Sequence, residues 1–514
     1  MTDIIGNKTL RDMWEEADTL WSEDTFLIYE DCDFKSCQYS YHQFYENIIK
    51  TANLFLSLGV KKGDRVAVQL SNSPEFIMCW FGLTQIGAIL VPLNPQYRDS
   101  ECDYILGKCR PKVVVLDYKL AKNHIGNRVS SVEYMLSARS SKDVEGFINF
   151  NKEMEKQSAE LLERPSFSSE DTAEFLFTSG TTSRPKGVII THCNTLYAGM
   201  IHAGQCGIRR NERFFTAMPC FHIDFQLMAV MSCLVSGATV VVSEHYSASN
   251  FWRQVCQYKA NVTDLMPFHI RTIMKQPVQS WEKDHCIRQA YFSMGMSTEE
   301  KNAFEERFNV RLLNCYGSTE TISCVTADPE TGLRRWPSVG RPAMGYEIRI
   351  VDSEGNELPA GKSGDIQVYG VPGRTLMRGY YDEPEYTASV FTDDGWFKTC
   401  DTGYLDEDGW LYFVDRDSTL IKSSGENISS TEIENVLTEH PEIMEAAVFG
   451  IPDPLRNQVV KAMVKLKENS TLTPEDIRCY CQQHLAKFKI PSVVEIVDDF
   501  PRTCTGKIKK QLLK

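Results

Sequence analysis

Residues Thr178 to Gly187, TSGTTSRPKG, have the composition of a loop that holds phosphate groups. Small residues let backbone N–H groups approach anionic oxygens, and hydroxyl side chains add further donors. Gly180 is the small residue near the middle of the loop, and hydroxyl donors come from Thr178, Ser179, Thr181 and Thr182. Lys186 adds a compact positive charge. This pattern predicts a site for the phosphates of ATP.

The spacing within this loop differs from that of a Walker A site. That motif places glycine before its lysine, Ser or Thr after it, and a helix next. Here Pro185 precedes Lys186, Gly187 follows, and the β-branched run 188–190 comes next. A mobile Ser/Thr/Gly linker is the structural alternative, but a linker does not need a Pro-Lys-Gly ending between two strand-like runs.

The elements around the loop indicate a layered α/β fold. Strand-like and helical runs alternate up to Gly340, which is typical of parallel sheets covered by helices. Strands are expected at 65–70, 88–92, 113–116, 175–177, 188–190 and 238–242, and helices at 41–58 and 249–259. Residues 120–164 are more polar and charged, so we expect surface helix and loop there.

After Gly340 the pattern changes to short strands separated by Gly and Asp turns. Strands expected at 347–351, 365–368 and 410–414 predict a distorted β-barrel that closes the large domain. Beyond it, helices at 430–440 and 474–485 and strands at 446–449 and 461–466 predict a small α+β domain.

Composition excludes several classes of protein. The chain has 514 residues, 42% of them hydrophobic and 24% charged, and its formal net charge of −14 disfavours a nucleic-acid surface. The apolar run 76–93 is broken by Thr84, Gln85 and two glycines, so it predicts a buried helix leading into a strand and no membrane span. The 17 cysteines lack metal-site spacing, and the start of the chain lacks a signal-peptide pattern. We therefore expect reduced thiols and a cytoplasmic protein.

Five short motifs follow the phosphate loop in order. They are Tyr316–Thr321 (YGSTET), Asp401–Gly403 (DTG), Val414–Arg416 (VDR), Gly425–Ile428 (GENI) and Pro501–Lys507 (PRTCTGK). With them the chain resembles the adenylate-forming superfamily over nearly its whole length, a group that includes acyl-CoA synthetases, luciferases and peptide-synthetase adenylation domains. The resemblance implies that ATP first joins a carboxylate to AMP, and that the acyl group then passes to a thiol. It implies ATP, Mg²⁺ and coenzyme A as co-substrate.

A closer resemblance is to the acyl-CoA synthetases that act on carnitine-type betaines. It rests on 4–6 (IIG), 51–55 (TANLF), 219–224 (PCFHID), 334–338 (RRWPS) and 486–489 (AKFK). It implies thioester formation from crotonobetaine, carnitine or γ-butyrobetaine. Two alternatives stay open: a short-chain acyl-CoA synthetase for an uncharged acid, and a non-catalytic nucleotide-binding protein of the same fold. The oligomeric state is not indicated.

The resemblance assigns the phosphate contacts to three residues. Lys186 would contact the β- and γ-phosphates, Thr319 the α-phosphate, and Glu320 the magnesium ion. A hard cation that keeps several waters suits a single protein carboxylate.

The rest of the nucleotide falls to two later motifs. Tyr316 would stack on adenine beside Gly317, while Asp401 and Arg416 would bind the ribose hydroxyls. A carboxylate suits this role because it accepts two donors at once.

The resemblance also divides the chain into a large domain, 1–416, and a small mobile domain, 417–514. The hinge is expected at Ser418, where relatives more often have Asp or Lys. Lys507 would be the principal catalytic cation of the first step, and Lys422 would assist it. A surface lysine is the alternative for Lys422.

For the second step, rotation of the small domain would bring Gly425 and Glu426 to line the pantetheine tunnel. His222 would lie at the mouth of that tunnel. A core histidine is the structural alternative.

The acyl pocket is expected to be unusual. Met294 and Gly295 belong to FSMGMS, which stands where relatives have a smaller Gly-Gly-Ala-Pro-like wall. Met294 and Met296 would shorten this pocket and favour a short acid, and core packing is the alternative for both. Asp224 is a candidate counter-charge for a trimethylammonium group, with Phe225 as an aromatic neighbour. A helix cap is the alternative for Asp224.

Overall fold

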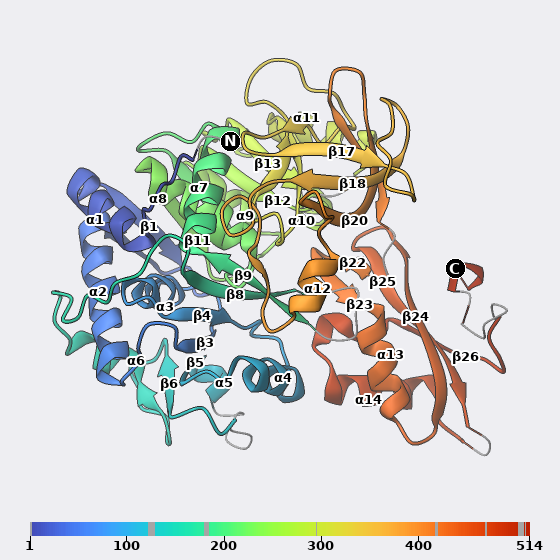
Figure 1. Ribbon diagram of the computed structural model, residues 1–514, viewed down its shortest axis with the longest axis horizontal. Coiled ribbons are helices and arrows are strands. Elements are labelled where there is room, and N and C mark those ends of the chain that lie inside the picture. Colours follow the sequence, from blue (N-terminus) through green and yellow to red (C-terminus); the bar gives the residue numbers. More distant parts are fainter. Residues whose placement is uncertain are drawn as a thin grey trace.

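The computed structural model describes residues 3–121, 129–178, 185–293, 296–416, 420–467, 470–501, 508 and 510–513. For six of these it describes the backbone alone: Asp415, Arg416, Leu420, Asn427, Thr431 and Gln511. Two large sheets with their helices are followed by a smaller antiparallel sheet and a carboxy-terminal α+β unit (Figure 1).

The first large sheet has eight strands in the order β19-β9-β8-β4-β3-β5-β6-β7. They are β3 (Arg65–Gln69), β4 (Ile89–Pro92), β5 (Val113–Asp117), β6 (Tyr134–Ala138), β7 (Ile148–Asn149), β8 (Thr172–Thr178), β9 (Lys186–Thr191) and β19 (Gly379–Tyr380). Strands β3 to β7 pair in parallel, whereas β8 and β9 are antiparallel, with Thr178 opposite Lys186. The phosphate loop therefore connects the ends of two adjacent strands.

The second large sheet has nine strands in the order β16-β15-β14-β13-β12-β10-β11-β1-β2. They are β1 (Thr25–Glu30), β2 (Ser36–Ser40), β10 (Arg213–Thr216), β11 (Thr239–Ser243), β12 (Val262–Leu265), β13 (Gln289–Ser293), β14 (Leu312–Gly317), β15 (Cys324–Ala327) and β16 (Arg341–Pro342). The six central strands are parallel, and β2, β15 and β16 are antiparallel at the edges. All six parallel strands end at the same edge of the sheet.

Helices pack against both sheets. One continuous core joins strands of the two sheets to α1 (Leu10–Trp21), α2 (Tyr41–Ser57), α3 (Pro74–Gln85), α7 (His192–Cys206), a π-helix η1 (Asp224–Val230) and α8 (Met231–Ser236). The others are α4 (Asp99–Cys109), α5 (Tyr118–Ala121), α6 (Phe150–Glu155), α9 (Phe251–Gln257), α10 (Pro267–Met274), α11 (Thr298–Phe308) and α12 (Pro384–Ser389). Local sequence sets the start of α2, where Ser40 and Gln43 form a capping box.

A four-stranded antiparallel sheet, β17-β18-β20-β21, follows the second large sheet. Its strands are β17 (Glu347–Val351), β18 (Gly364–Tyr369), β20 (Trp396–Leu405) and β21 (Leu411–Arg416). It is an open half-barrel in the region where the sequence predicts a barrel. Its pairing places Asp401 opposite Arg416.

The carboxy-terminal unit has strands β22 (Leu420–Ser423), β23 (Glu426–Ser429), β24 (Ile443–Asp453), β25 (Asn457–Leu466) and β26 (Val493–Ile496). Its helices are α13 (Ser430–Glu439), α14 (Pro474–His484) and the short 3₁₀ turns η2 (Lys487–Lys489) and η3 (Lys510–Leu512). Ile421, Val448, Val464 and Ile477 belong to a hydrophobic cluster confined to this unit. The unit thus has a core of its own (orange and red in Figure 1).

The α/β fold predicted from the sequence is confirmed, with one error at residues 120–164. Strand β6 lies in that segment and pairs in parallel with β5, and Leu136, Ser137 and Ala138 are fully buried. The strand is only five residues long, so its polar neighbours dominate the composition. The cysteines of the described residues are free thiols. In the described ranges, every helix is too short or too polar to cross a membrane.

Candidate active site

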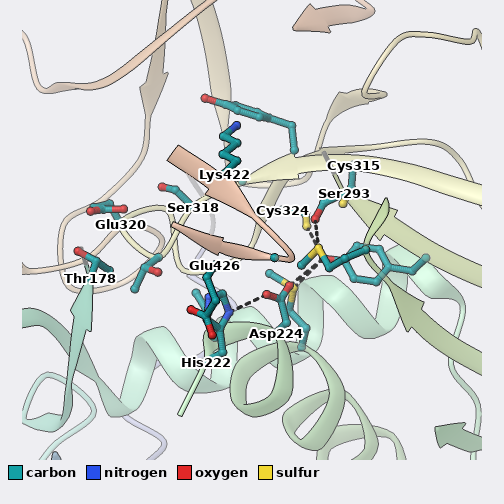
Figure 2. Close-up of a pocket in the computed structure, with 18 of the residues that line it drawn as sticks. Thr178, His222, Asp224, Ser293, Cys315, Ser318, Glu320, Cys324, Lys422 and Glu426 are labelled. Carbon is teal, nitrogen blue, oxygen red and sulfur yellow. Dashed lines mark hydrogen bonds and ion pairs between the residues drawn. The ribbon is translucent and has the colours of Figure 1, made fainter. Parts of the chain in front are cut away.

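A cavity of about 310 Å³ lies at the carboxyl ends of strands from both large sheets. Thr178 ends β8, Ser293 ends β13 and Gly317 ends β14, and all three line the cavity. Open α/β sheets bind ligands in the crevice beyond the carboxyl ends of their strands. Hairpin β22–β23 of the carboxy-terminal unit also reaches this wall (Figure 2).

Tyr316 and Asp401 form one side of the cavity. The Tyr316 hydroxyl donates to Asp401 Oδ2 at 2.7 Å, so an aromatic ring and a carboxylate are held together. Gly317 makes a close approach, because a Cβ there would lie 2.4 Å from the backbone oxygen of Ser323. With Arg416 opposite Asp401 in the backbone register, the structure brings the predicted adenine and ribose motifs together.

Glu320 and Thr319 line the same cavity just beyond β14. The Tyr380 hydroxyl donates to Glu320 Oε1 at 2.9 Å and orients this carboxylate. Lys186 is buried at the start of β9, outside the cavity wall, with its Nζ 4.1 Å from the centre of the Tyr386 ring. Burial lowers the pKa of Lys186, although the charge of Glu320 opposes this shift.

A buried pair, His222 and Asp224, lies on another side of the cavity. His222 Nδ1 is 2.8 Å from Asp224 Oδ2 (Figure 2). The Tyr291 hydroxyl donates to the other oxygen, Oδ1, at 3.3 Å. Burial opposes both charges, but this hydrogen bond raises the pKa of His222 and lowers the pKa of Asp224. Asp224 is therefore an ionised carboxylate that is only 6% exposed.

A second cavity of about 320 Å³ adjoins the first. Seven residues line both cavities: Asn94, Phe221, His222, Asp224, Met266, Gly425 and Glu426. We call this shared wall the seam. Gly425 adopts a φ of 90° in the turn between β22 and β23, a conformation that favours glycine. The seam is thus built by the large unit and by the carboxy-terminal unit together.

Glu426 lies beside His222 in the seam (Figure 2). Burial raises the pKa of Glu426, whereas the charges of His222 and Lys489 act to lower it. The residues described by the structure donate no hydrogen bond to this carboxylate. Lys422, also from β22–β23, lines the first cavity with its Nζ 5.1 Å from the centre of the Phe413 ring.

Lys489 connects the carboxy-terminal unit to the large unit. Its Nζ lies 2.5 Å from Glu101 Oε1 in α4 and 2.7 Å from Glu432 Oε1 in α13. The Tyr97 ring centre is 4.9 Å away, and Lys489 is 1% exposed. Although burial opposes it, the Tyr97 hydroxyl and the two carboxylates raise the pKa of Lys489. The contact is therefore a buried ion triad.

Several predicted residues fall outside the described ranges: Ser179, Gly180, Thr181, Thr182, Met294, Gly295, Ser418 and Lys507. Phe225, which the sequence analysis placed beside Asp224 in the acyl pocket, stays a prediction. It is fully buried in the core, 6.2 Å from Phe76 between ring centres, and lines neither of the two cavities. Successive helical side chains point in different directions, so Asp224 can face the cavity while Phe225 faces the core.

Sequence reasoning missed Tyr291, Tyr380 and Lys489 as site residues. Tyr291 stands two positions before Ser293 on β13, and strand alternation would have placed both on one face. Tyr380 and Lys489 reach the site through contacts between distant segments, for which no local signal exists.

The family described as AMP-binding enzyme matches residues 14–381. The chain belongs to the AMP-binding enzyme family. The family's C-terminal domain matches residues 432–507. This AMP-binding enzyme is 44% identical to the crotonobetaine/carnitine–CoA ligases of Citrobacter koseri and Salmonella paratyphi C, with 100% of each chain covered.

Solved structures extend this similarity to the fold. An o-succinylbenzoate CoA synthetase from Bacillus subtilis with a bound product analogue is 27% identical, covers 99% of this chain and 98% of its own, and has a TM-score of 0.86. ATP-bound MatB from Rhodopseudomonas palustris is 25% identical, covers 98% of both chains, and has a TM-score of 0.72.

Proposed function

We propose that this enzyme is an ATP-dependent acid–CoA ligase for carnitine-type betaines. It converts crotonobetaine, carnitine or γ-butyrobetaine to an acyl-adenylate with release of pyrophosphate, and then to the CoA thioester with release of AMP. The observation that carries this proposal is the 44% identity, over whole chains, to ligases named for crotonobetaine and carnitine.

The walls of the first cavity support a cationic substrate. A quaternary ammonium group has no N–H to donate, so proteins hold it with aromatic rings and nearby negative charge. Ionised Asp224 and the ring of Tyr291 supply both, beside the soft side chains of Met228 and Cys324. An uncharged acid would leave the Asp224 charge without this partner.

The nucleotide side of the cavity supports adenylation. The Tyr316 ring offers a face for adenine, and Asp401 offers a carboxylate to the ribose beside Arg416. Thr178 and Thr319 present hydroxyl donors where the phosphates would lie. The distance between the attacking carboxylate and the phosphates is then set by the protein, which lowers the entropic barrier.

Charge repulsion is the main obstacle of the first step. Two anions a few ångströms apart repel by about 1 to 4 kcal/mol in wet or partly wet surroundings. Lys186, Lys507 and Lys422 are the cations we assign to offset this repulsion, with Lys507 between carboxylate and α-phosphate. Lys186 is already held near the Thr178 end of the phosphate loop by strand pairing.

Glu320 fits the expected magnesium ion. Its carboxylate lines the cavity and is oriented by Tyr380, and hard oxygen ligands suit Mg²⁺. When bound, the ion would neutralise phosphate charge.

For the second step we assign the domain boundary to 416/417, with Ser418 as the hinge. Hairpin β22–β23 places Gly425 and Glu426 in the seam, where an acyl group in one cavity would meet a thiol arriving through the other.

Pyrophosphate exchange tests the proposal. With ATP and Mg²⁺, we expect exchange that depends on the three betaines and is much weaker with butyrate and crotonate. Preference for the uncharged acids would replace the substrate and keep the reaction class. If none of the carboxylates supports pyrophosphate exchange, the protein would bind nucleotide without catalysing this reaction.

The role of Lys507 has its own test. Lys507→Ala should lower pyrophosphate exchange by about 10²-fold or more, because a cation made for the transition state is lost. Thioester formation from a supplied acyl-adenylate should stay within a few-fold of the unaltered enzyme. Equal loss of both half-reactions would contradict the assignment.

A further inference from the structure

The His222 imidazole stands at the point where the two cavities meet. Its Nδ1 is engaged by Asp224 Oδ2 at 2.8 Å. The described residues offer no hydrogen-bond partner to the other ring nitrogen, Nε2. The side chain is 32% exposed although Asp224 is nearly buried, so the ring has open space on the side away from Asp224. A ligand atom in the seam could reach Nε2 from either cavity.

The chemistry of the second half-reaction requires a proton acceptor at this point. A thiol of ordinary pKa, about 8.5, is only a few per cent ionised at pH 7, and the thiolate is the nucleophile. An acceptor must contact the thiol proton while the sulfur faces the acyl carbon. The seam is where those two conditions meet, because it borders both cavities.

We propose that His222 is the general base that removes the thiol proton of coenzyme A, and that Asp224 is its positioning residue. This inference rests on the proposed function. The S–H bond breaks as its proton moves to His222 Nε2, and the sulfur electron pair forms the bond to the acyl carbon. The acyl–oxygen bond to AMP then breaks, and AMP leaves with that electron pair. The imidazolium returns its proton to solvent after the thioester leaves.

Asp224 supplies what such a base needs. By accepting a hydrogen bond from Nδ1–H, it fixes the tautomer that leaves the Nε2 lone pair available. Tyr291 fixes Asp224 in turn through Oδ1. The pair is therefore oriented before any ligand binds.

The charges around the ring set its working pH. Asp224 and Glu426 are the charged groups that face His222, and Lys489 acts on Glu426 from the carboxy-terminal unit. Burial acts against the imidazolium, but the two carboxylates outweigh it and raise the pKa of His222 above its usual 6.5. Removal of either negative charge should lower that pKa.

The decisive experiment separates the half-reactions. His222→Gln should lower thioester formation from supplied acyl-adenylate and CoA by about 10²-fold, the usual contribution of a general base. Adenylate formation, measured by trapping with hydroxylamine or by pyrophosphate exchange, should stay within about three-fold. A lack of pyrophosphate exchange by the unaltered enzyme with every carboxylate would refute the proposed function. That result is distinct from one that contradicts only the role of His222.

The pH profile of the second half-reaction tests the positioning role. In the unaltered enzyme its rate should rise with pH through the pKa of His222, since the neutral imidazole is the base. Asp224→Asn and Glu426→Gln should each move this limb to lower pH, and Asp224→Asn should also lower the plateau about ten-fold. A merely structural role for Asp224 would lower the rate without moving the limb.

The chain offers a matched control in a second His–Asp pair. His42 Nδ1 lies 2.9 Å from Asp18 Oδ1, at an exposed position that lines neither cavity. His42→Gln and Asp18→Asn should leave both half-reactions and the pH limb unchanged. Two results would overturn the proposal. In the first, His222→Gln retains the normal rate of the second half-reaction or the rise of that rate with pH. In the second, the variant loses both half-reactions equally while its melting temperature is unchanged.

Discussion

Two glutamates of this enzyme differ in the donors around them, and their pKa values move in opposite directions. Glu30 on β1 is 1% exposed and accepts hydrogen bonds from Arg253 at 2.5 Å, Tyr258 at 2.6 Å and Gln254 at 2.7 Å. These donors lower its pKa although burial opposes them. Glu426 has no such donors among the described residues, and burial raises its pKa. Hydrogen bonds to the charged form can therefore outweigh the effect of burial on the pKa of a carboxyl group.

Glu432 is intermediate between these two. Its partner Lys489 is shared with Glu101, and burial still raises the pKa of Glu432 while Lys489 lowers it. The three glutamates also differ in their place in the molecule. Glu30 joins β1 to α9 and to Tyr258 within the large unit, whereas Glu432 and Glu426 lie where the carboxy-terminal unit meets the large unit.

Removal of the Lys489 charge should have the largest effect. Lys489→Met leaves Glu101 and Glu432 buried beside each other, a loss of about 3 to 5 kcal/mol for a broken buried pair. We expect thioester formation from supplied acyl-adenylate to fall about 10²-fold, because the arrangement that forms the seam is less populated. Pyrophosphate exchange should change little.

Lys487→Met is the control for this variant, since Lys487 is exposed on the same short turn. It should leave both half-reactions unchanged. Parallel loss of the two half-reactions in Lys489→Met would show that the triad maintains the fold and does not select a domain arrangement.

Loss of the Glu30 charge should affect stability and leave catalysis unchanged. Glu30→Gln keeps one acceptor oxygen but weakens its charge-assisted bonds, at a cost of about 2 kcal/mol. The urea midpoint, followed by tryptophan fluorescence, should fall at pH 7, while Glu23→Gln at an exposed position should shift it little. An unchanged midpoint would show that the three donors add nothing net.

The smallest expected effect is the change of stability with pH, which has opposite signs for Glu30 and Glu426. The stabilising contribution of ionised Glu30 is present above the unfolded pKa of about 4.3 and is lost as pH falls, because its folded pKa is lowered. Protonated Glu426 contributes below that value and loses its contribution as pH rises through its raised folded pKa. Glu426→Gln should therefore stabilise the protein slightly at pH 8, by less than about 1 kcal/mol after solvent screening. Urea midpoints from pH 4 to 8 should diverge in opposite directions for the two variants.

The sequence predicted the fold class correctly, and two of its nucleotide motifs lie side by side in the structure, joined by the hydrogen bond from Tyr316 to Asp401. Strand periodicity predicted β3, β4, β5 and β11 closely, because the central residues of each strand are apolar and buried. It failed at β6, where five residues stand among polar neighbours.

Contacts between distant segments limited the site prediction. His222 and Asp224 are two residues apart, and the sequence analysis named both but did not predict the contact between them. The Tyr380–Glu320 bond spans 60 residues, and the Lys489–Glu101 pair spans 388. Such pairs depend on how units dock, which hydrophobic periodicity does not encode.

The seam also has a consequence for inhibitor chemistry. Since seven residues border both chambers, one compound with an acyl-adenosine head and a pantetheine-like arm would fill both at once. Docking of the head would present the arm at an effective concentration on the order of millimolar, so affinity could exceed that of either fragment by about 10² to 10⁴. Such a compound would also contact the large unit and the carboxy-terminal unit at the same time, because the seam is built from both.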